Sequence, residues 1–142
     1  MTHLLDTDHL SILQRPGSFL HSAVLANLNR HTPGDAVVSI VSFHEQMLGC
    51  NNKISKAITE ADLVRGHELF QAIIEDYTRF TVLPFDAAAA GEFTSLRSRR
   101  IRIATKDLRI ATTALTRNLT LVTRNRRDFG LVPGLRIEDW TK

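Results

Sequence analysis

Short apolar runs alternate along this chain with longer segments in which hydrophobic residues recur at helical spacing. The short runs are predicted to be strands, over residues 3–6, 36–40, 80–83, 119–123 and 135–137, and the run over residues 36–40 is rich in β-branched residues. Helical patterns cover residues 8–14, 18–30, 42–48, 53–79, 86–100 and 105–117, with a helical turn predicted over residues 125–129. Strands that alternate with helices in this way are typical of a mostly parallel sheet covered by helices. The chain is therefore predicted to be an α/β protein.

The helical pattern over residues 53–79 is the longest one and is amphipathic. Its apolar positions, which are candidate core residues, are Ala57, Leu63, Leu69, Phe70, Ile73 and Ile74. Near the end of the chain, Trp140 is expected to anchor the C-terminus against the body of the protein. No repeat, low-complexity segment or linker divides the sequence. We therefore expect a single domain over residues 1–142.

The composition, with 43% hydrophobic and 23% charged residues among 142, is ordinary for a soluble globular protein. A chain of this length can bury a sizeable core without disulfides or structural metal. The single cysteine, Cys50, cannot form an internal disulfide, and no Cys/His spacing resembles a zinc site. No apolar run approaches the roughly 18–20 residues of a membrane span, and the N-terminus lacks a signal-peptide core. We expect a cytoplasmic protein with no membrane partner.

The charge is distributed unevenly, although the formal net charge is only +3. Between Arg97 and Arg127 there are ten basic residues and one acid, Asp107, which gives this segment a net charge of +9. The rest of the chain carries eight basic and 14 acidic residues. Clustered arginines with few acids are the electrostatic footprint of a polyanion partner such as nucleic acid. A solvated, arginine-rich helix end is the structural alternative.

Four carboxylates share a placement relative to the predicted strands, and they are Asp6, Glu45, Asp107 and Asp128. The first ends a strand, the second follows a strand by one helical turn, the third opens a helix, and the fourth follows the strand over residues 119–123. If these strands are parallel neighbours, the four acids lie near one edge of the sheet, where α/β proteins usually bind ligands. Carboxylates this close repel one another unless a cation neutralises them. Because Mg²⁺ and Mn²⁺ take oxygen ligands, the pattern indicates a metal site.

Each acid also has a structural interpretation as part of a helix cap. Ser42 and Glu45 have the spacing of a capping box. Asp107 lies in a first helical turn with Thr105 as the expected cap, where the helix dipole favours an anion. Further candidate cap residues are Asp8, Asn125 and Asp128. Capping alone does not explain why all four acids fall near one sheet edge.

The motifs of several other enzyme classes are absent. The chain has no G-x-S-x-G, no P-loop and no G-x-G-x-x-G sequence, so serine hydrolysis and nucleoside-triphosphate chemistry have no support. No pair of the six histidines has metal-ligand spacing on one helix face.

Four blocks of the sequence closely resemble the PIN-domain proteins of the VapC toxin type. The blocks are LLDTDHLS, VSFHEQMLG, IATKDLRIATTAL and LTLVTRNRRDFGLVPGLRIEDW, and they follow in this order from about Leu4 to Trp140. The last two blocks are the most specific. The resemblance implies a three-layer α/β/α sandwich with a mostly parallel central sheet of about four or five strands. It also implies a metal-dependent endoribonuclease that is the toxin half of a toxin–antitoxin pair.

Carried over to this chain, the resemblance assigns catalysis and the binding of Mg²⁺ or Mn²⁺ to Asp6, Glu45, Asp107 and Asp128. It also marks Thr123 and Asn125 as polar residues that line the site. Two positions depart from the family pattern. Asp8 stands where the family usually has Asn, so an extra carboxylate could tighten metal binding or change the preferred metal. Ala104 stands where the family often has Gly, which affects the loop before the third acid.

The basic segment complements the acids in this interpretation, because the acids hold metal but would repel RNA. Candidate contacts to phosphate groups are Arg97, Arg99, Arg100, Arg102, Lys106, Arg124 and residues 125–127. The candidate substrate-binding residues closest to the acids in sequence are Asp8, Arg102, Lys106, Thr123, Arg124 and Asn125. Binding through phosphates weakens steeply with salt.

The resemblance further implies an antitoxin partner, since a free ribonuclease would harm its host, and frequently a homodimer. Apolar residues of the early helices are candidate docking surface, namely Leu20, Val24, Leu48 and Leu63. Packing in the core is the alternative for at least half of them.

Two other functions stay open at this stage. A PIN-like RNA-binding module would bind RNA and leave it intact. A haloacid-dehalogenase-like phosphatase also opens with a strand that runs into Asp-x-Asp, and it would use Asp6 as nucleophile and Asp8 as general acid/base. That motif usually has Thr or Val two residues after the second acid, whereas this chain has Leu10. RNA cleavage separates the nuclease from the binding module, and a phosphoenzyme trapped on Asp6 would identify the phosphatase.

Overall fold

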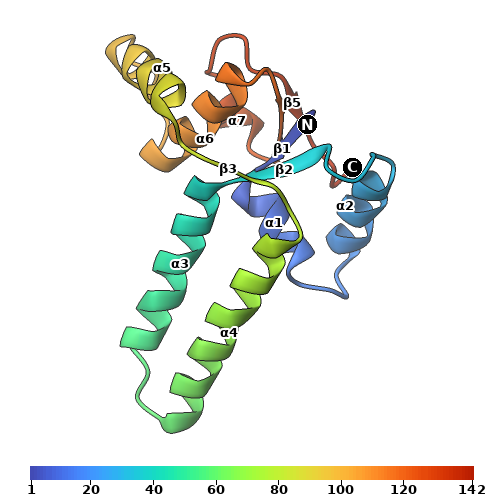
Figure 1. Cartoon of the computed structure of the whole chain (residues 1–142), viewed down its shortest axis with the longest axis vertical. Coiled ribbons are helices and arrows are strands. Elements are labelled where there is room, and N and C mark those ends of the chain that lie inside the picture. The colour runs from blue at the N-terminus through green and yellow to red at the C-terminus, as the bar shows by residue number, and fades with distance from the viewer.

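Five short parallel strands form one sheet at the centre of the molecule (Figure 1). The computed structural model describes all residues from Met1 to Lys142. The strands are β1 (His3–Leu5), β2 (Ala36–Ser39), β3 (Val82–Leu83), β4 (Thr120–Val122) and β5 (Ile137–Glu138), in the order β3-β2-β1-β4-β5. Leu4 of β1 is in register with Val37 of β2 and Leu121 of β4, and all four pairings are parallel. The predicted α/β class is confirmed.

Seven helices connect and cover the strands. They are α1 (Thr7–Leu13), α2 (Phe19–Asn29), α3 (Ile40–Ser55), α4 (Glu60–Thr78), α5 (Ala87–Ser98), α6 (Thr105–Thr116) and α7 (Arg126–Phe129). None of them is long and apolar enough to cross a membrane.

The helices lie in two layers, one on each face of the sheet (Figure 1). Leu4 and Leu5 are adjacent in β1 and point to opposite faces, because side chains alternate along a strand. Leu4 lies in a buried cluster with side chains of α5, α6 and α7, and Leu5 lies in a second cluster with side chains of α1 to α4. The three-layer α/β/α sandwich implied by the resemblance is therefore present. Trp140 is only 3% exposed in the second cluster, which confirms its predicted role as an anchor.

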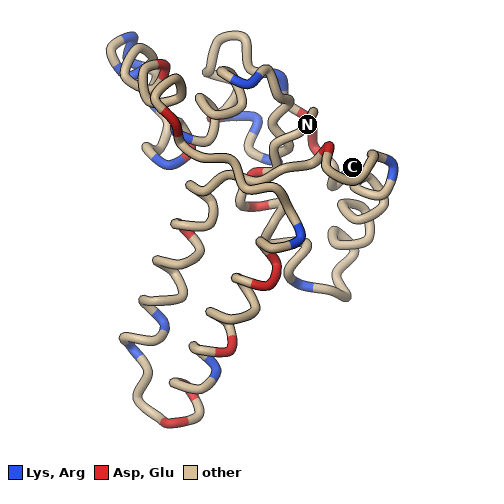
Figure 2. Tube along the Cα trace, in the orientation of Figure 1, with Lys and Arg blue, Asp and Glu red and all other residues tan.

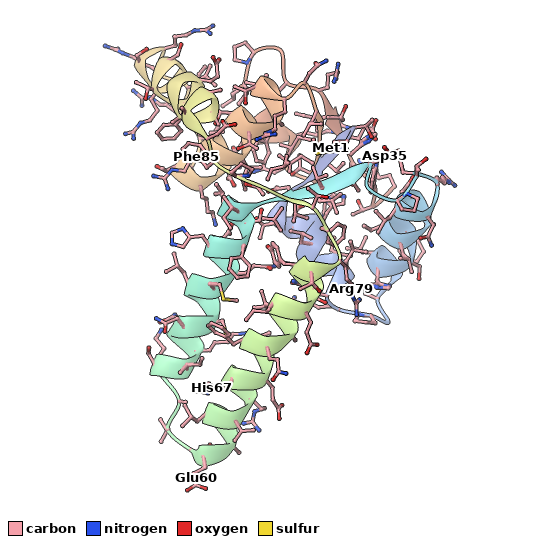
Figure 3. All side chains as sticks on the ribbon, in the orientation of Figure 1. Met1, Asp35, Glu60, His67, Arg79 and Phe85 are labelled. Atoms are coloured by element: carbon pink, nitrogen blue, oxygen red, sulfur yellow. The ribbon has the colours of Figure 1, made fainter.

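Helices α3 and α4 form an antiparallel hairpin that extends away from the sheet (Figure 1). Figure 3 shows their side chains meeting between the two helices, with Glu60 labelled at the far tip. The helices approach closely at Gly66, where a Cβ atom would lie 2.7 Å from Cγ1 of Ile54. The thiol of Cys50 also donates to the Gly66 carbonyl oxygen at 3.3 Å.

The hairpin corrects the prediction of one helical pattern over residues 53–79. Helix α3 continues to Ser55, the chain turns, and Thr59 caps α4 by accepting a hydrogen bond from the Asp62 N–H. Periodicity alone hides such a turn, because both helices carry apolar residues on the faces that meet. Only some of the predicted core residues are buried, since the outer hairpin has no further layer over it. Ile73 is buried, whereas the exposed ones are Leu63, Phe70 and Ile74.

The apolar residues considered as docking surface divide in the same way. Val24 is fully buried in the core, so its interpretation as docking surface is wrong. Leu48 and Leu63 on the hairpin are exposed, and Leu20 is half-buried.

The last strand also differs from the prediction over residues 135–137, because Ile137 and Glu138 are the residues that pair with β4.

Candidate active site

The candidate site lies at the carboxyl ends of the two central strands, β1 and β4. The chain runs from β1 outward to β2 and β3 and then returns to place β4 on the other side of β1. This reversal is a topological switch point, where the crevice at the carboxyl ends of parallel strands is open for a ligand. Asp6 directly follows β1 and Thr123 directly follows β4, so the fold brings these two residues side by side.

Asp6 is a buried carboxylate that both ends β1 and caps α1. Its Oδ1 accepts a hydrogen bond from the Thr7 N–H at 2.8 Å, and its Oδ2 accepts one from the Thr123 hydroxyl at 2.8 Å. Only 5% of the Asp6 surface is exposed to solvent. Burial, followed by the negative charge of Asp8, raises the pKa of Asp6 from 3.8 to about 7. The two hydrogen bonds oppose this rise without cancelling it.

Asp8 lies beside Asp6 but is not a helix cap, so that interpretation is wrong. Its Oδ1 is 2.8 Å from Nδ1 of His9, and its Oδ2 accepts a hydrogen bond from the Arg124 N–H at 3.1 Å. The Thr123 hydroxyl lies 3.5 Å from the same Oδ2. The extra carboxylate relative to the family pattern is therefore fixed at the edge of the site.

Glu45 points into the site from α3. Its Oε2 accepts a hydrogen bond from the Thr7 hydroxyl at 3.0 Å, and its Oε1 accepts one from Lys106 Nζ at 2.6 Å. The capping box predicted for Ser42 and Glu45 does not form, because α3 begins at Ile40 and Ser39 caps it. Instead, the buried Ser42 hydroxyl lies 2.9 Å from that of Thr7, which supports the group that holds Glu45.

Asp107 lies in the first turn of α6, as predicted. The helix has Ala104 at its N-cap with no side-chain hydrogen bond, so the expected cap by Thr105 is absent. Ala104 has φ −55° and ψ 143°, which any residue adopts, so the departure from glycine causes no strain. Burial raises the pKa of Asp107, with further increases from Glu45, Asp128 and Asp8 against a decrease from Lys106.

Asp128 lies in the first turn of α7 and has the cap predicted for it. Asn125 accepts a hydrogen bond from the Asp128 N–H at 3.3 Å and donates its side-chain amide to Asp128 Oδ2 at 3.0 Å. Arg127 Nε donates to the other oxygen at 3.2 Å. These hydrogen bonds, first from Asn125 and then from Arg127, lower the pKa of Asp128.

The donor set fits a hard divalent cation in its chemistry, although the carboxylates are held by other partners in this structure. Asp6 and Asp107 both carry raised pKa values, first because they are buried and then because neighbouring carboxylates repel their ionised forms. Additional positive charge would relieve this repulsion, and oxygen ligands suit Mg²⁺ or Mn²⁺. No group of three His, Cys, Asp or Glu side chains lies close enough together to hold a metal ion as the side chains stand. Lys106 and Arg127 occupy oxygens of Glu45 and Asp128 instead.

The basic residues gather on the α5–α6–α7 side of the sheet, whereas α4 carries several acids (Figure 2). Lys106 and Arg124 are exposed beside the acids, and the exposed Arg102 precedes Asp107 by five positions in the sequence. All three are accessible to a ligand. Farther out, the guanidinium groups of Arg97 and Arg109 each lie 5.5 Å from the centre of the Phe93 ring. The hydrogen bond from Lys106 to Glu45 raises the pKa of Lys106.

Three residues of this site were not predicted from the sequence. Thr7 orients Glu45, Ser42 supports Thr7, and His9 contacts Asp8. Thr7 has a weak signal in the sequence, since it lies between two acids at a strand end. Ser42 has none, because its partner Thr7 lies 35 positions away. His9 directly follows Asp8, but its second partner, Trp140, lies 131 positions away.

Comparison with known proteins agrees with this fold. Residues 4–135 match the PIN domain family. A tRNA(fMet)-specific endonuclease VapC from Shigella flexneri is 38% identical over 96 residues, which cover 60% of this chain and 73% of the relative. FitAcB from Neisseria gonorrhoeae has a crystal structure that superposes with a TM-score of 0.73 at 27% identity, covering 98% of both chains. The crystal structure of DNA-bound VapBC from Salmonella typhimurium gives a TM-score of 0.72 at 26% identity, covering 99% of this chain and 98% of that one.

The fold and the acidic crevice thus define an α/β protein with a cluster of carboxylates at a topological switch point. The chain belongs to the PIN-domain family, and within it to the VapC-type endonucleases. This membership removes the support for the haloacid-dehalogenase-like alternative.

Proposed function

We propose that this chain is a metal-dependent endoribonuclease that hydrolyses RNA phosphodiester bonds and acts as the toxin of a toxin–antitoxin pair. The observation that best supports this proposal is the buried Asp6 carboxyl at the switch point, whose pKa burial and neighbouring acids raise to about 7. Membership of the PIN-domain family supports it as well. The Shigella flexneri relative is by name specific for tRNA(fMet), which supports a structured RNA as substrate.

The residues proposed to hold one or two Mg²⁺ or Mn²⁺ ions are Asp6, Glu45, Asp107 and Asp128. When bound, the metal lowers the pKa of water and stabilises charge that develops on the phosphoryl oxygens. Thr123 fixes the Asp6 carboxylate and Thr7 fixes that of Glu45, so neither must be ordered when the substrate binds. Glu45 completes the site as a ligand through water or as the base that orients the attacking water. Attack by water leaves a 5′-phosphate and a 3′-hydroxyl.

Exposed cations around the acids are proposed to bind the phosphates that flank the scissile bond. Lys106 and Arg124 suit this role, since both are exposed beside the carboxylates, and the exposed Arg102 is proposed to act with them. Thr123 and Asn125 would add polar contacts at the same edge. This binding should weaken as the salt concentration rises, because each phosphate contact releases counterions.

An antitoxin protein is the proposed partner that restrains the enzyme. Several solved structures with this fold are toxin–antitoxin complexes, including the VapBC complex from Salmonella typhimurium. We further propose that the chain works as a single PIN domain in the cytoplasm, as a homodimer.

The test is a cleavage assay on structured RNA with Mg²⁺, with Mn²⁺ and with chelator. The Asp107→Asn variant should lose cleavage by about a hundredfold or more, because the amide removes a charge that the metal requires. Glu68→Gln is a matched control, since Glu68 is an exposed acid on the far hairpin.

The outcome separates the nuclease from an RNA-binding module with the same fold. Metal-dependent cleavage with 5′-phosphate products, lost in Asp107→Asn and kept in Glu68→Gln, supports the nuclease. RNA binding without cleavage under either metal would reject it in favour of the binding module.

A further inference from the structure

His9 is a fully buried histidine that joins the edge of the acidic site to the C-terminal segment of the chain. It lies on α1 with 0% exposure, directly after Asp8. We propose that His9 is a positioning residue for Asp8, which it holds toward the acidic cluster through a link to the docked C-terminal segment. This inference rests on the proposed function, because it concerns the metal affinity of that same site.

The hydrogen bonds of His9 determine which ring nitrogen carries the proton. The Trp140 N–H lies 3.2 Å from Nε2, and a backbone N–H can only donate, so Nε2 is the acceptor. The proton is therefore on Nδ1, which lies 2.8 Å from Asp8 Oδ1 and donates to it. Both ring nitrogens have partners, as burial of a polar side chain requires.

This arrangement holds Asp8 from two sides. The His9 ring donates to one carboxylate oxygen, and the Arg124 N–H donates to the other at 3.1 Å. With both oxygens engaged, the carboxylate is held beside Asp6, and 32% of its side chain is exposed. The Thr123 hydroxyl lies 2.8 Å from Asp6 Oδ2 and 3.5 Å from Asp8 Oδ2, so the two carboxylates lie on either side of one group of the site.

The other end of the link is anchored by α2. Asn27 donates its side-chain amide to the Trp140 carbonyl oxygen at 3.0 Å, and the Trp140 indole stacks on His31 with 4.9 Å between ring centres. The indole N–H donates to Glu138 at 2.9 Å. Because Trp140 is held in this way, its backbone N–H is a fixed donor for His9.

A histidine with only a structural role in the core would also be buried and would also have hydrogen bonds at both ring nitrogens. Two substitutions distinguish the roles, because each keeps one nitrogen position. In His9→Asn the side-chain amide can reach the Nδ1 position and still donate to Asp8, but nothing replaces Nε2. In His9→Gln the side-chain carbonyl can reach the Nε2 position and accept from Trp140, but nothing replaces Nδ1.

The experiment measures Mn²⁺ affinity and thermal stability of the full-length chain without RNA. We expect His9→Gln to keep its stability and to bind Mn²⁺ about tenfold more weakly, as loss of a group that orients a ligand typically does. We expect His9→Asn to lose stability and to keep Mn²⁺ affinity within about twofold of wild type.

A double variant tests whether His9 acts through Asp8. Asp8→Asn should also weaken Mn²⁺ binding, and adding His9→Gln to it should cause little further loss, since coupled residues are not additive. The positioning role would be overturned if the two substitutions weakened Mn²⁺ binding additively. It would also be overturned if Mn²⁺ affinity fell in proportion to thermal stability in every variant.

A measurement without metal keeps this inference separate from the proposed function. NMR of the imidazole nitrogens should find His9 protonated at Nδ1, with a slowly exchanging proton that exchanges faster in Asp8→Ala. If wild type bound no Mn²⁺, the proposed function would fail while this spectrum still tested the contact. A proton on Nε2, or exchange that ignores Asp8→Ala, would reject the positioning of Asp8.

Discussion

Lys106 donates a hydrogen bond from Nζ to Oε1 of Glu45 across 2.6 Å, which places a cation of the chain itself among the carboxylates of the site. The two residues are 61 positions apart and come from α6 and α3. The ammonium group offsets part of the charge repulsion at Asp107, whose pKa it lowers against the effect of burial.

We expect Lys106→Met to bind Mn²⁺ severalfold more tightly in the absence of RNA, because Glu45 is then free for the metal. The same variant should bind RNA more weakly, and the slope of log affinity against log salt should fall by about one. Calorimetry measures the metal and filter binding at several salt concentrations measures the RNA. Lys53→Met on the distant hairpin is the control, and unchanged Mn²⁺ affinity in Lys106→Met would contradict the expectation.

Asp6→Asn should stabilise the metal-free protein at about pH 8 and have little effect at or below about pH 4, where the carboxyl is protonated in both states. The folded pKa of about 7 lies above the unfolded value of 3.8, so the folded state binds the proton more tightly. Stability therefore falls as the pH rises from about 4 to about 7, and above this range the ionised carboxylate destabilises the fold. The neutral amide in Asp6→Asn removes this destabilisation, which is about a few kcal/mol.

Thermal unfolding across this pH range measures the effect, with Glu68→Gln as the control for loss of a charge on the surface. Addition of Mg²⁺ at the higher pH should raise the melting temperature of wild type and not that of Asp6→Asn. A variant less stable than wild type at about pH 8 would show that the hydrogen bonds of Asp6 outweigh its burial.

Thr7→Val should lower the rate of RNA cleavage by about tenfold, because Glu45 loses the hydroxyl that orients it. Thr7→Ser retains the hydroxyl and should keep most of the activity. Rates under single-turnover conditions for the two variants provide the comparison. Activity kept in Thr7→Val but lost in Thr7→Ser would instead assign the effect to packing of the Thr7 methyl group.

Gly66→Ala should destabilise the protein by about 1–3 kcal/mol, because the new methyl group would meet the Ile54 side chain of α3. Gly49→Ala is the matched control, since a Cβ there meets nothing within 4 Å. Because Gly49 lies within a helix, Gly49→Ala should instead raise the free energy of unfolding by roughly 0.5–1 kcal/mol. Chemical denaturation measures both, and equal stability of the two variants would argue against tight packing of the hairpin.

The sequence by itself determined the class of fold and where the acids lie. Alternation of short apolar runs with helical patterns depends on the local periodicity of hydrophobic residues, which the chain carries directly. Asp6 and Asp107 could be placed for the same reason, since parallel strands put their carboxyl ends at one edge of the sheet. The cap formed by Asn125 and Asp128 is also local, because the two residues are only three positions apart.

Only the tertiary structure decided which side chains meet and where the long helices end. The capping box at Ser42 and Glu45 is wrong because the predicted strand runs to Ile40, whereas α3 already begins at Ile40 and Val41 packs in the core as part of that helix. The α3–α4 turn was missed because the apolar faces of both helices have the same period. The partners of Glu45 and His9 come from other elements, and such contacts depend on packing between elements, which no local pattern encodes.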